Sequence, residues 1–356
     1  MTADAALRFA PLSQIAPSAW DAVTAGRALP TQQYIWAAAA AEAFDAGPDM
    51  PIAVIGPLDA PHALAQFVKL PTGAGRYGWI AADTTGEIYE VIARDQDAAN
   101  ALAGGLARLG RCLDFGHYPA DTPWVDALRR AHRGRGIVMT LMRTERCMPS
   151  IALTPAWLDP IGQMLARQSD MKRKAKAAAK IGVLGFQCAA PSSAELAPLL
   201  EEALAVETRS WKGRAGTAVL CNPAVARFFR AYGARAAKAG ILRLFFLRIG
   251  GVTAAAQIAV ETEDAFWQLK IGFDEQFQKV SPGNLLMAET IRWSVQRGLK
   301  TYHFYGKEAD WTRDWTLEAR PCLALRTYPF NPLGLAAAGA DGVSLAWRAA
   351  KRKLGR

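Results

Sequence analysis

The chain has 356 residues, of which 51% are hydrophobic, 21% charged and 9% aromatic. This length suggests about two domains, each large enough to bury its own core. The composition, with 11 Trp and 14 Phe, excludes a largely disordered or fibrous protein. The 42 Lys and Arg residues against 32 Asp and Glu residues leave a net charge of +10. Such a charge favours anionic partners: phosphorylated cofactors, nucleic acid or an acidic membrane surface.

The sequence shows no membrane-spanning, secretory or metal-binding pattern. No apolar run approaches the roughly 18 residues of a spanning helix, and Asp4 and Arg8 interrupt the region where a signal peptide needs an apolar core. We therefore expect a cytoplasmic protein. The cysteines and histidines stand far apart, without ligand spacing: Cys112, Cys147, Cys188, Cys221, Cys322, His62, His117, His132 and His303. We expect reduced thiols and no metal.

The first half alternates strand-like and helix-like segments. Short apolar runs bounded by Gly, Pro or Asp predict strands at residues 52–55, 63–70, 77–81, 111–115 and 137–143. Helical spacing predicts helices at residues 33–44, 95–109 and 123–133. This order indicates an α/β unit.

The second half repeats the order. Helices are predicted at residues 170–180, 193–211 and 281–296, and strands at residues 242–249, 252–261, 265–273 and 301–305. Gly250 and Gly251 form a two-residue connection of the kind that closes a hairpin. Two similar α/β units follow from this repetition.

These segments predict three parts of the chain. Residues 1–150 form the first unit, residues 151–330 the second, and residues 331–356 a tail that is rich in Gly and Ala and then basic. The boundary near residue 150 rests on the spaced prolines Pro149, Pro155 and Pro160. The last segment, residues 343–356, has five Lys and Arg residues and no acid, which predicts an appended basic helix.

One junction between a strand and a helix favours an anion. The strand 265–273 leads into a helix starting at Ser281, Pro282 and Gly283, with Lys279 just before it. Free N–H groups and the positive end of the helix dipole attract phosphate. The same residues are also typical of an ordinary helix start, with Ser281 as the N-cap and Pro282 in the first turn.

Several motifs together resemble a known family. They are residues 207–217 (ETRSWKGRAGT), 270–275 (KIGFDE), 281–286 (SPGNLL), 302–308 (YHFYGKE) and 311–315 (WTRDW), with 30–36 (PTQQYIW) in the first half. This set resembles bacterial GNAT-fold acyltransferases of the cellulose, exopolysaccharide and holdfast type, which are related to the Fem aminoacyltransferases. The resemblance is specific in the second half and looser in the first.

The resemblance implies an α/β (α+β) protein with two tandem GNAT-like domains, each a mixed central sheet flanked by helices. The first would be degenerate and the second catalytic, with acetyl-CoA or another acyl-CoA as co-substrate. The donor's pantetheine arm would follow residues 267–273 and its pyrophosphate would lie at residues 280–284. The implied donor-binding residues are Lys270, Ile271, Lys279, Ser281, Gly283 and Asn284.

Acyl transfer to an amine needs a base for the ammonium proton and an acid for the leaving thiolate. Glu207 ends an amphipathic helix beside an apolar loop and is a candidate base, or else a solvated carboxylate paired with a neighbouring cation. Asp274 is either a catalytic carboxylate or part of a charged turn. His303 stands where related sequences often have Asp. It is either a candidate base or a packed residue of the strand. Tyr305 is a candidate acid or a core residue.

The acceptor is expected to meet aromatic and charged side chains. The candidates are Trp211, Lys212, Glu275, Trp311 and Arg313. Aromatic faces beside a guanidinium suit a sugar, although the same residues also suit a packed loop.

The expected function is transfer of an acyl group from acyl-CoA to an amine, in particular to an amino sugar of an exopolysaccharide or its lipid-linked precursor. One alternative is a Fem-like transferase that uses aminoacyl-tRNA, with the basic helix 170–180 on the RNA phosphates. Another is a non-catalytic module that binds a nucleotide or membrane during polysaccharide assembly. The basic segment 343–356 would place the enzyme peripherally on the inner face of the cell membrane.

Overall fold

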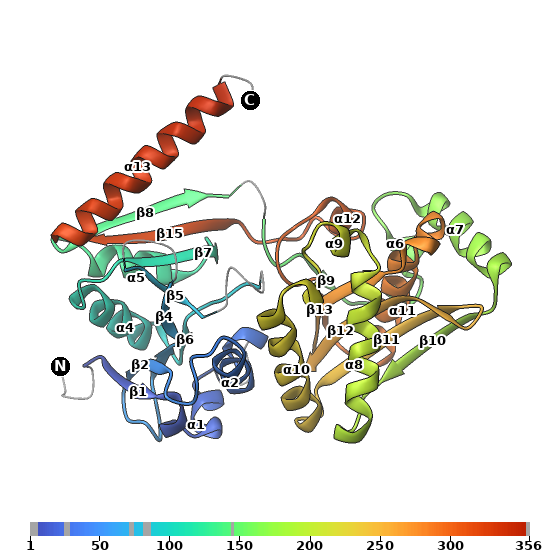
Figure 1. Cartoon of the computed structure of the whole chain (residues 1–356), viewed down its shortest axis with the longest axis horizontal. Coiled ribbons are helices and arrows are strands. Elements are labelled where there is room, and N and C mark those ends of the chain that lie inside the picture. The colour runs from blue at the N-terminus through green and yellow to red at the C-terminus, as the bar shows by residue number, and fades with distance from the viewer. Residues whose placement is uncertain (1–5, 25–28, 71–74, 81–86, 144–145, 354–356) are drawn as a thin grey trace.

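The computed structural model describes residues 6–24, 29–70, 75–80, 87–143 and 146–353. The described chain forms two units that lie side by side (Figure 1). The first unit contains residues 6–143 together with residues 321–353, and the second contains residues 146–320. Sheets flanked by helices make up both units, which confirms the predicted mixed α/β class.

Two small sheets form the framework of the first unit. One has the order β1 (Arg8–Pro11), β2 (Pro51–Ile55), β3 (Ala63–Ala65) and β6 (Ile92–Ala93). The other has the order β4 (Phe67–Lys69), β5 (Tyr77–Trp79), β7 (Leu113–Pro119), β15 (Cys322–Pro329) and β8 (Gly136–Met142). Its β5–β7 pair is parallel and its other pairs are antiparallel. The helices are α1 (Pro17–Asp21), α2 (Tyr34–Ala43), α4 (Gln96–Arg108), α5 (Pro123–Ala131) and α13 (Pro332–Lys353).

Strand β15 changes the predicted division of the chain. It pairs antiparallel with both β7 and β8, so the chain returns to the first sheet after completing the second unit. The predicted boundary at residue 330 therefore does not coincide with the sheets. The predicted strand 63–70 also differs, because it is interrupted at Gln66 and its two parts belong to different sheets.

A single sheet forms the centre of the second unit. Its order is β10 (Leu184–Ala189), β11 (Leu242–Ile249), β12 (Val252–Thr262), β13 (Ala265–Phe273), β14 (Thr301–His303) and β9 (Ser150–Ala152). Only the β13–β14 pair is parallel. The helices are α6 (Pro160–Gln163), α7 (Gln168–Ile181), α8 (Ser193–Thr208), α9 (Trp211–Arg214), α10 (Pro223–Lys238), α11 (Pro282–Gln296) and α12 (Asp310–Arg313).

Local sequence signals account for the ends of several elements. Gly250 and Gly251 both have positive φ, at 59° and 84°, as the tight β11–β12 turn requires. A capping box of Ser192 and Glu195 starts α8. The helix predicted over 193–211 ends at Thr208, because Ser210 starts the short α9, where its side chain accepts a bond from the Lys212 N–H.

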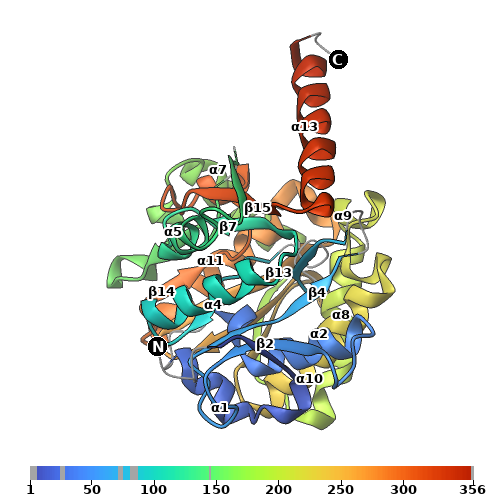
Figure 2. The ribbon, with the colours of Figure 1, turned by 90° about the vertical axis from the view of Figure 1, so that its left-hand side faces the viewer.

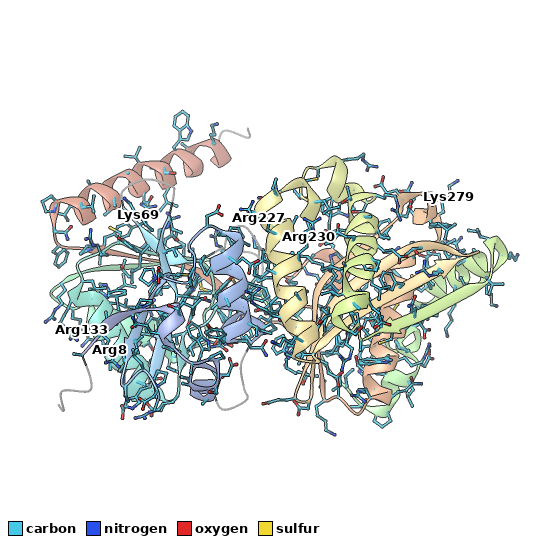
Figure 3. The ribbon with its side chains drawn as sticks, turned by 60° about the horizontal axis from the view of Figure 1, so that its bottom comes forward. Arg8, Lys69, Arg133, Arg227, Arg230 and Lys279 are labelled. Carbon is cyan, nitrogen blue, oxygen red and sulfur yellow. The ribbon has the colours of Figure 1, made fainter. Side chains whose placement is uncertain are left out.

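The two units share one hydrophobic core. Trp36 of α2 packs against Phe228 and Tyr232 of α10, with ring centroids 4.7 and 4.8 Å apart. Arg227, labelled in Figure 3, donates across the boundary to the Ala43 carbonyl at the end of α2, at 2.7 Å. A second core lies on the other face of the large sheet, under α7 and α11. The units are therefore packed against each other over a buried surface.

The C-terminal helix α13 projects away from the body of the protein (Figure 2). It begins at Pro332, 11 residues before the predicted start at residue 343, because Asn331 accepts a bond from the Gly334 N–H and the Ala-rich segment continues as helix. Near its base, Asp341 pairs with Arg76 at 2.7 Å and with Arg326 at 3.0 Å. Val343 and Trp347 further along are exposed.

Candidate functional site

A cavity of about 290 Å³ lies where strand β13 meets the start of helix α11. Its walls are Ser210, Trp211, Lys212, Ile271, Gly272, Phe273, Gln278, Ser281, Gly283, Asn284, Met287 and Trp311. Helices α9 and α12 each contribute a tryptophan to these walls, Trp211 and Trp311. Four of the six predicted donor-binding residues line this cavity, namely Ile271, Ser281, Gly283 and Asn284.

Among the described residues, no strand pairs with the edge of β13 beside this cavity. Strand β14 pairs with β13 only as far as His303 opposite Trp267, while β13 continues to Phe273. A register shift against β12 leaves Leu269 as an extra residue in β13, and such bulges occur often beside active sites. Unpaired strand edges can hydrogen-bond an extended ligand through their backbone groups.

The start of helix α11 adds positive potential. Ser281 has a left-handed backbone with φ 50°, and its hydroxyl accepts a bond from the Lys174 ammonium at 2.8 Å. Lys174 belongs to α7, the helix predicted to contact RNA phosphates in the aminoacyl-tRNA alternative, and it is also paired with Asp170 at 3.0 Å. The helix dipole and this ammonium together favour a phosphate group at the cavity.

A larger cavity of about 770 Å³ lies between the two units. It is lined by Glu87, Glu207, Trp211, Lys212, Gly216, Thr217, Ala218, Val219, Asn222, Val225, Leu269, Lys270, Tyr305, Gly306 and Lys307. Glu87 comes from the first unit and the remainder from the second. Trp211 and Lys212 line both cavities, so the two spaces adjoin at α9.

Glu207 lies buried in the wall of the larger cavity, with 4% of its surface exposed. Its Oε1 accepts a bond from Lys212 Nζ at 2.8 Å and its Oε2 from the Val219 N–H at 3.0 Å. The same Lys212 ammonium also donates to the Ile271 carbonyl of β13 at 2.8 Å. A carboxylate and a primary ammonium are thus held together where the two cavities adjoin.

Glu87 and Lys270 form a second ion pair in the larger cavity. Lys270 Nζ lies 2.8 Å from Glu87 Oε1 and 5.3 Å from the ring centroid of Phe229. Burial raises the pKa of Glu87, although Lys270 and Lys212 act against the rise. Lys270 was predicted to bind the donor. Alternate residues of a strand point to opposite faces, and the Lys270 side chain faces the larger cavity instead.

Four other predicted residues, Asp274, Glu275, Lys279 and Arg313, lie outside both cavities. Asp274 accepts bonds from Arg209 Nε at 2.6 Å and from the Gln276 N–H at 3.1 Å, which makes it the cap of a short helical turn. Glu275 is paired with Arg214. Arg313 is paired with Glu308 at 3.0 Å and Asp310 at 3.2 Å. Exposed Lys279 is labelled in Figure 3 at the outer side of the second unit. Trp311 lines the smaller cavity.

Tyr305 joins the two units. Its hydroxyl donates to the Ile88 carbonyl at 2.8 Å and lies 2.9 Å from the Thr31 hydroxyl. Burial raises the pKa of Tyr305 well above its ordinary value. Its proton is therefore committed to the first unit, and this arrangement does not favour the predicted role as an acid for the leaving thiolate.

His303 lies in β14 and lines neither cavity. Its ring stacks on Trp267 with centroids 3.9 Å apart, and its Nδ1 has no hydrogen-bond partner among the described residues. Burial, together with nearby Arg320, lowers the pKa of His303 to about 4. A stacked ring of lowered pKa that lines neither cavity does not favour the predicted role of His303 as a base.

The lowered pKa of His303 predicts a pH dependence of stability. The unfolded chain takes up a proton near pH 6.5 but the folded chain only near pH 4, so stability is full above about pH 6.5 and falls between these values as the pH decreases. Acidification to pH 5 should remove on the order of 2 kcal/mol of stability through this residue. Urea unfolding of wild type and His303→Phe at pH 7.5 and pH 5 measures it. Equal losses in both proteins on acidification would contradict the assignment.

A comparison with protein families assigns part of the chain. Residues 166–313 match the family described as an acetyltransferase (GNAT) domain. The second unit contains a GNAT acetyltransferase domain. The protein is accordingly an enzyme of the N-acyltransferase class, as predicted. A search of curated proteins found no match.

Several solved structures resemble most of this chain in fold, including parts of both units. FemX aligns with a TM-score of 0.57 at 12% identity, over 89% of this chain and 96% of that chain. A conserved protein of unknown function from Bacteroides thetaiotaomicron aligns with a TM-score of 0.56 at 10% identity, over 89% and 99%. The C-terminal domain of a putative lysylphosphatidylglycerol synthetase from Agrobacterium fabrum aligns with a TM-score of 0.50 at 12% identity, over 80% and 85%.

Glu87, Lys174 and Lys307 lie at the site but had not been predicted from the sequence as individual site residues. Glu87 stands in the first half and reaches the GNAT domain only through tertiary packing, so no local pattern marks it. Lys307 was visible inside the motif 302–308 but received no role. In the described part of the chain, no helix is long and apolar enough to span a membrane.

Proposed function

We propose that the protein transfers an acyl group from acyl-CoA, with acetyl-CoA as the simplest donor, to the amine of an amino sugar of an exopolysaccharide or its lipid-linked precursor. The observation that carries this proposal is the pair of adjoining cavities. The smaller one has an unpaired strand edge and a helix start, which suit pantetheine and phosphate. The larger one has buried carboxylates, which suit an amine.

The residues at the junction support the following step. The Glu207 carboxylate takes a proton from the acceptor's ammonium, and the neutral amine attacks the thioester carbonyl. The C–S bond breaks, the attacking nitrogen loses one proton, the coenzyme A thiolate takes up a proton in its place, and an amide and free coenzyme A remain. Glu207 is oriented for this step because both of its oxygens are held, by Lys212 and by the Val219 N–H.

The surroundings of the junction support a sugar as the acceptor. Trp211 is 52% exposed and lines both cavities. An exposed aromatic ring beside a lysine can stack on a sugar ring while the lysine bonds its hydroxyl groups. Trp315 of the motif 311–315 is instead buried in the core under α7 and α11.

Aminoacyl-tRNA is a second candidate donor. The fold resembles that of FemX, and α7 carries Lys172, Arg173, Lys174, Lys176 and Lys180, with Lys174 bonded to Ser281 at the smaller cavity. A row of cations at this place can contact RNA phosphates. Both candidates use the same acceptor cavity. Val343 and Trp347 of α13 are exposed, and contact of this helix with an anionic membrane surface remains a prediction.

Thermal unfolding with acetyl-CoA, coenzyme A or tRNA tests the donor. We expect acetyl-CoA at about a hundred times its dissociation constant to raise the midpoint by roughly 5–10 °C. Lys174→Gln should weaken this shift because it removes the ammonium at Ser281, whereas Lys176→Gln, an exposed residue of the same helix, should not. A shift with tRNA alone, reduced in both variants, would instead support the aminoacyl-tRNA donor. No shift with acetyl-CoA or coenzyme A would contradict the acyl-CoA proposal.

A further inference from the structure

Among its described lining residues, the larger cavity has more positive than negative groups. Its lining includes two carboxylates, Glu87 and Glu207, and three ammonium groups, Lys212, Lys270 and Lys307. Lys212 is paired with Glu207 and Lys270 with Glu87, each at 2.8 Å. The described lining therefore carries one more positive than negative side chain.

The unmatched charge belongs to Lys307. Its side chain is exposed, and no carboxylate of the described chain lies within ion-pair distance of it. Both of the other lysines in the lining have a carboxylate partner. A cation in a cavity wall without a partner is available to bind an anionic group of a ligand.

The backbone that carries Lys307 is held in place. Lys307 forms an antiparallel bridge with Cys147, and the preceding Gly306 carbonyl accepts a bond from the Met148 N–H at 2.7 Å. The following Glu308 N–H donates to the Arg146 carbonyl at 2.8 Å. The backbone position of this lysine is thus fixed by the segment 146–148, and its side chain is exposed.

The space available fits more than a small amine. A cavity of about 770 Å³ lies in the upper part of the range for drug-sized ligands, roughly 300–1,000 Å³. A sugar that carries both an amine and an anionic group can therefore extend within one cavity from the carboxylate of Glu207 toward the ammonium of Lys307.

We propose that the acceptor carries a phosphate or carboxylate group in addition to its amine, and that Lys307 binds this anionic group. This inference rests on the proposed function, because it names the class of acceptor that the same site takes. It distinguishes anionic amino sugars from neutral ones, and it makes Lys307 a residue that determines specificity without taking part in the proton transfer.

Binding of three amino sugars tests the inference without any need for turnover. The probes are glucosamine, glucosamine 6-phosphate and muramic acid, which are respectively neutral, phosphorylated and carboxylated apart from their amine. Calorimetric titration of wild type should show tighter binding of one or both anionic probes. Lys307→Gln should weaken that binding by about tenfold or more, since a hydrogen bond to a charged group contributes at least this factor, and should change glucosamine binding less than about twofold.

Two further variants complete the experiment. Lys307→Arg keeps the charge and should retain most of the preference for the anionic probe. Lys238→Gln removes an equal charge from an exposed lysine at the end of α10, outside both cavities, and should leave all affinities unchanged. The phosphate and carboxylate probes separate the two possible sources of the anion.

The outcomes separate this inference from the proposed function. Equal binding of neutral and anionic probes by wild type, or an equal loss for all three probes in Lys307→Gln, would overturn the role of Lys307. Release of coenzyme A from acetyl-CoA, measured with the same acceptors, reports on the proposed function. Absence of release with selective anion binding would contradict the acetyl-CoA donor and leave the role of Lys307 standing.

Discussion

Glu207→Gln should reduce kcat by about 10²–10⁴-fold, the usual contribution of a positioned general base. The amide keeps the size of the side chain and can still accept a bond from the Val219 N–H or from Lys212, but it cannot take a proton from the acceptor. The measurement is the initial rate of coenzyme A release at saturating acetyl-CoA and amino sugar.

Stability has to be measured beside this activity. Glu207 is buried and paired with Lys212 at 2.8 Å, and removing one partner of a buried ion pair commonly costs about 3–5 kcal/mol. The midpoint of thermal unfolding and its rise with acetyl-CoA show whether the variant is folded and binds the donor. A folded variant that binds acetyl-CoA and keeps wild-type kcat would remove Glu207 from the proposed mechanism.

Glu201→Gln is the matched control. Glu201 lies on the same helix α8, and its ion pair with Arg230 is exposed at 47% and 46% of the two side chains. Exposed pairs contribute about 0–1 kcal/mol, and this pair lies outside both cavities. We expect its kcat to stay at the wild-type value.

Gly272→Ala should impair both the fold and the activity. A Cβ at this position would lie 2.5 Å from Glu207 Cα and 2.8 Å from Glu207 Cβ, so β13 and α8 would have to separate. Overpacking of this kind costs about 1–3 kcal/mol. It would also displace the proposed base, and a shift of about 1 Å can lower turnover by roughly a hundredfold. Urea unfolding and the coenzyme A release assay measure the two effects.

Gly339→Ala provides the comparison for this substitution. Gly339 lies in α13 with no atom within 4 Å of the position of an added Cβ. Since Ala favours a helix over Gly by about 1 kcal/mol, this variant should be as stable as wild type or more so, with unchanged activity. Equal behaviour of the two variants would show that the β13–α8 approach is not as tight as the structure indicates.

The secondary structure of the second unit was largely predictable because its signals are local. The strands predicted at 242–249 and 265–273 occur with those bounds, and the Gly250–Gly251 connection forms the expected hairpin turn. The sequence reasoning did not identify helix α10 or strands β10 and β15. β15 pairs with strands that lie some 200 residues earlier, as in its register of Cys322 with Pro119, and nothing in its own sequence indicates that partner.

The candidate site was predictable in part for a similar reason. Ser281, Gly283 and Asn284 stand at the start of a helix, and a helix start is recognisable from adjacent residues. The conformation of Ser281 and its bond to Lys174, 107 residues away, are not. His303 and Asp274 could be listed as titratable residues, but their burial, stacking and capping bonds depend on neighbours that the sequence places elsewhere.

Periodicity and turn residues were sufficient to indicate an α/β protein, and the family resemblance of the motifs 207–217, 270–275 and 281–286 indicated an acyltransferase and the strand and helix proposed to bind its donor. Side-chain spacing along a strand or helix follows from local geometry, so such features can be read directly. The larger cavity, the proposed acceptor site, could not be predicted from such local features. Its ion pair of Glu87 with Lys270 arises because packing of the two units brings distant segments together, and so does the position of Lys307, which has no carboxylate partner in the described chain. Charge pairing acts through space over a few ångströms, and those distances exist only in the folded chain.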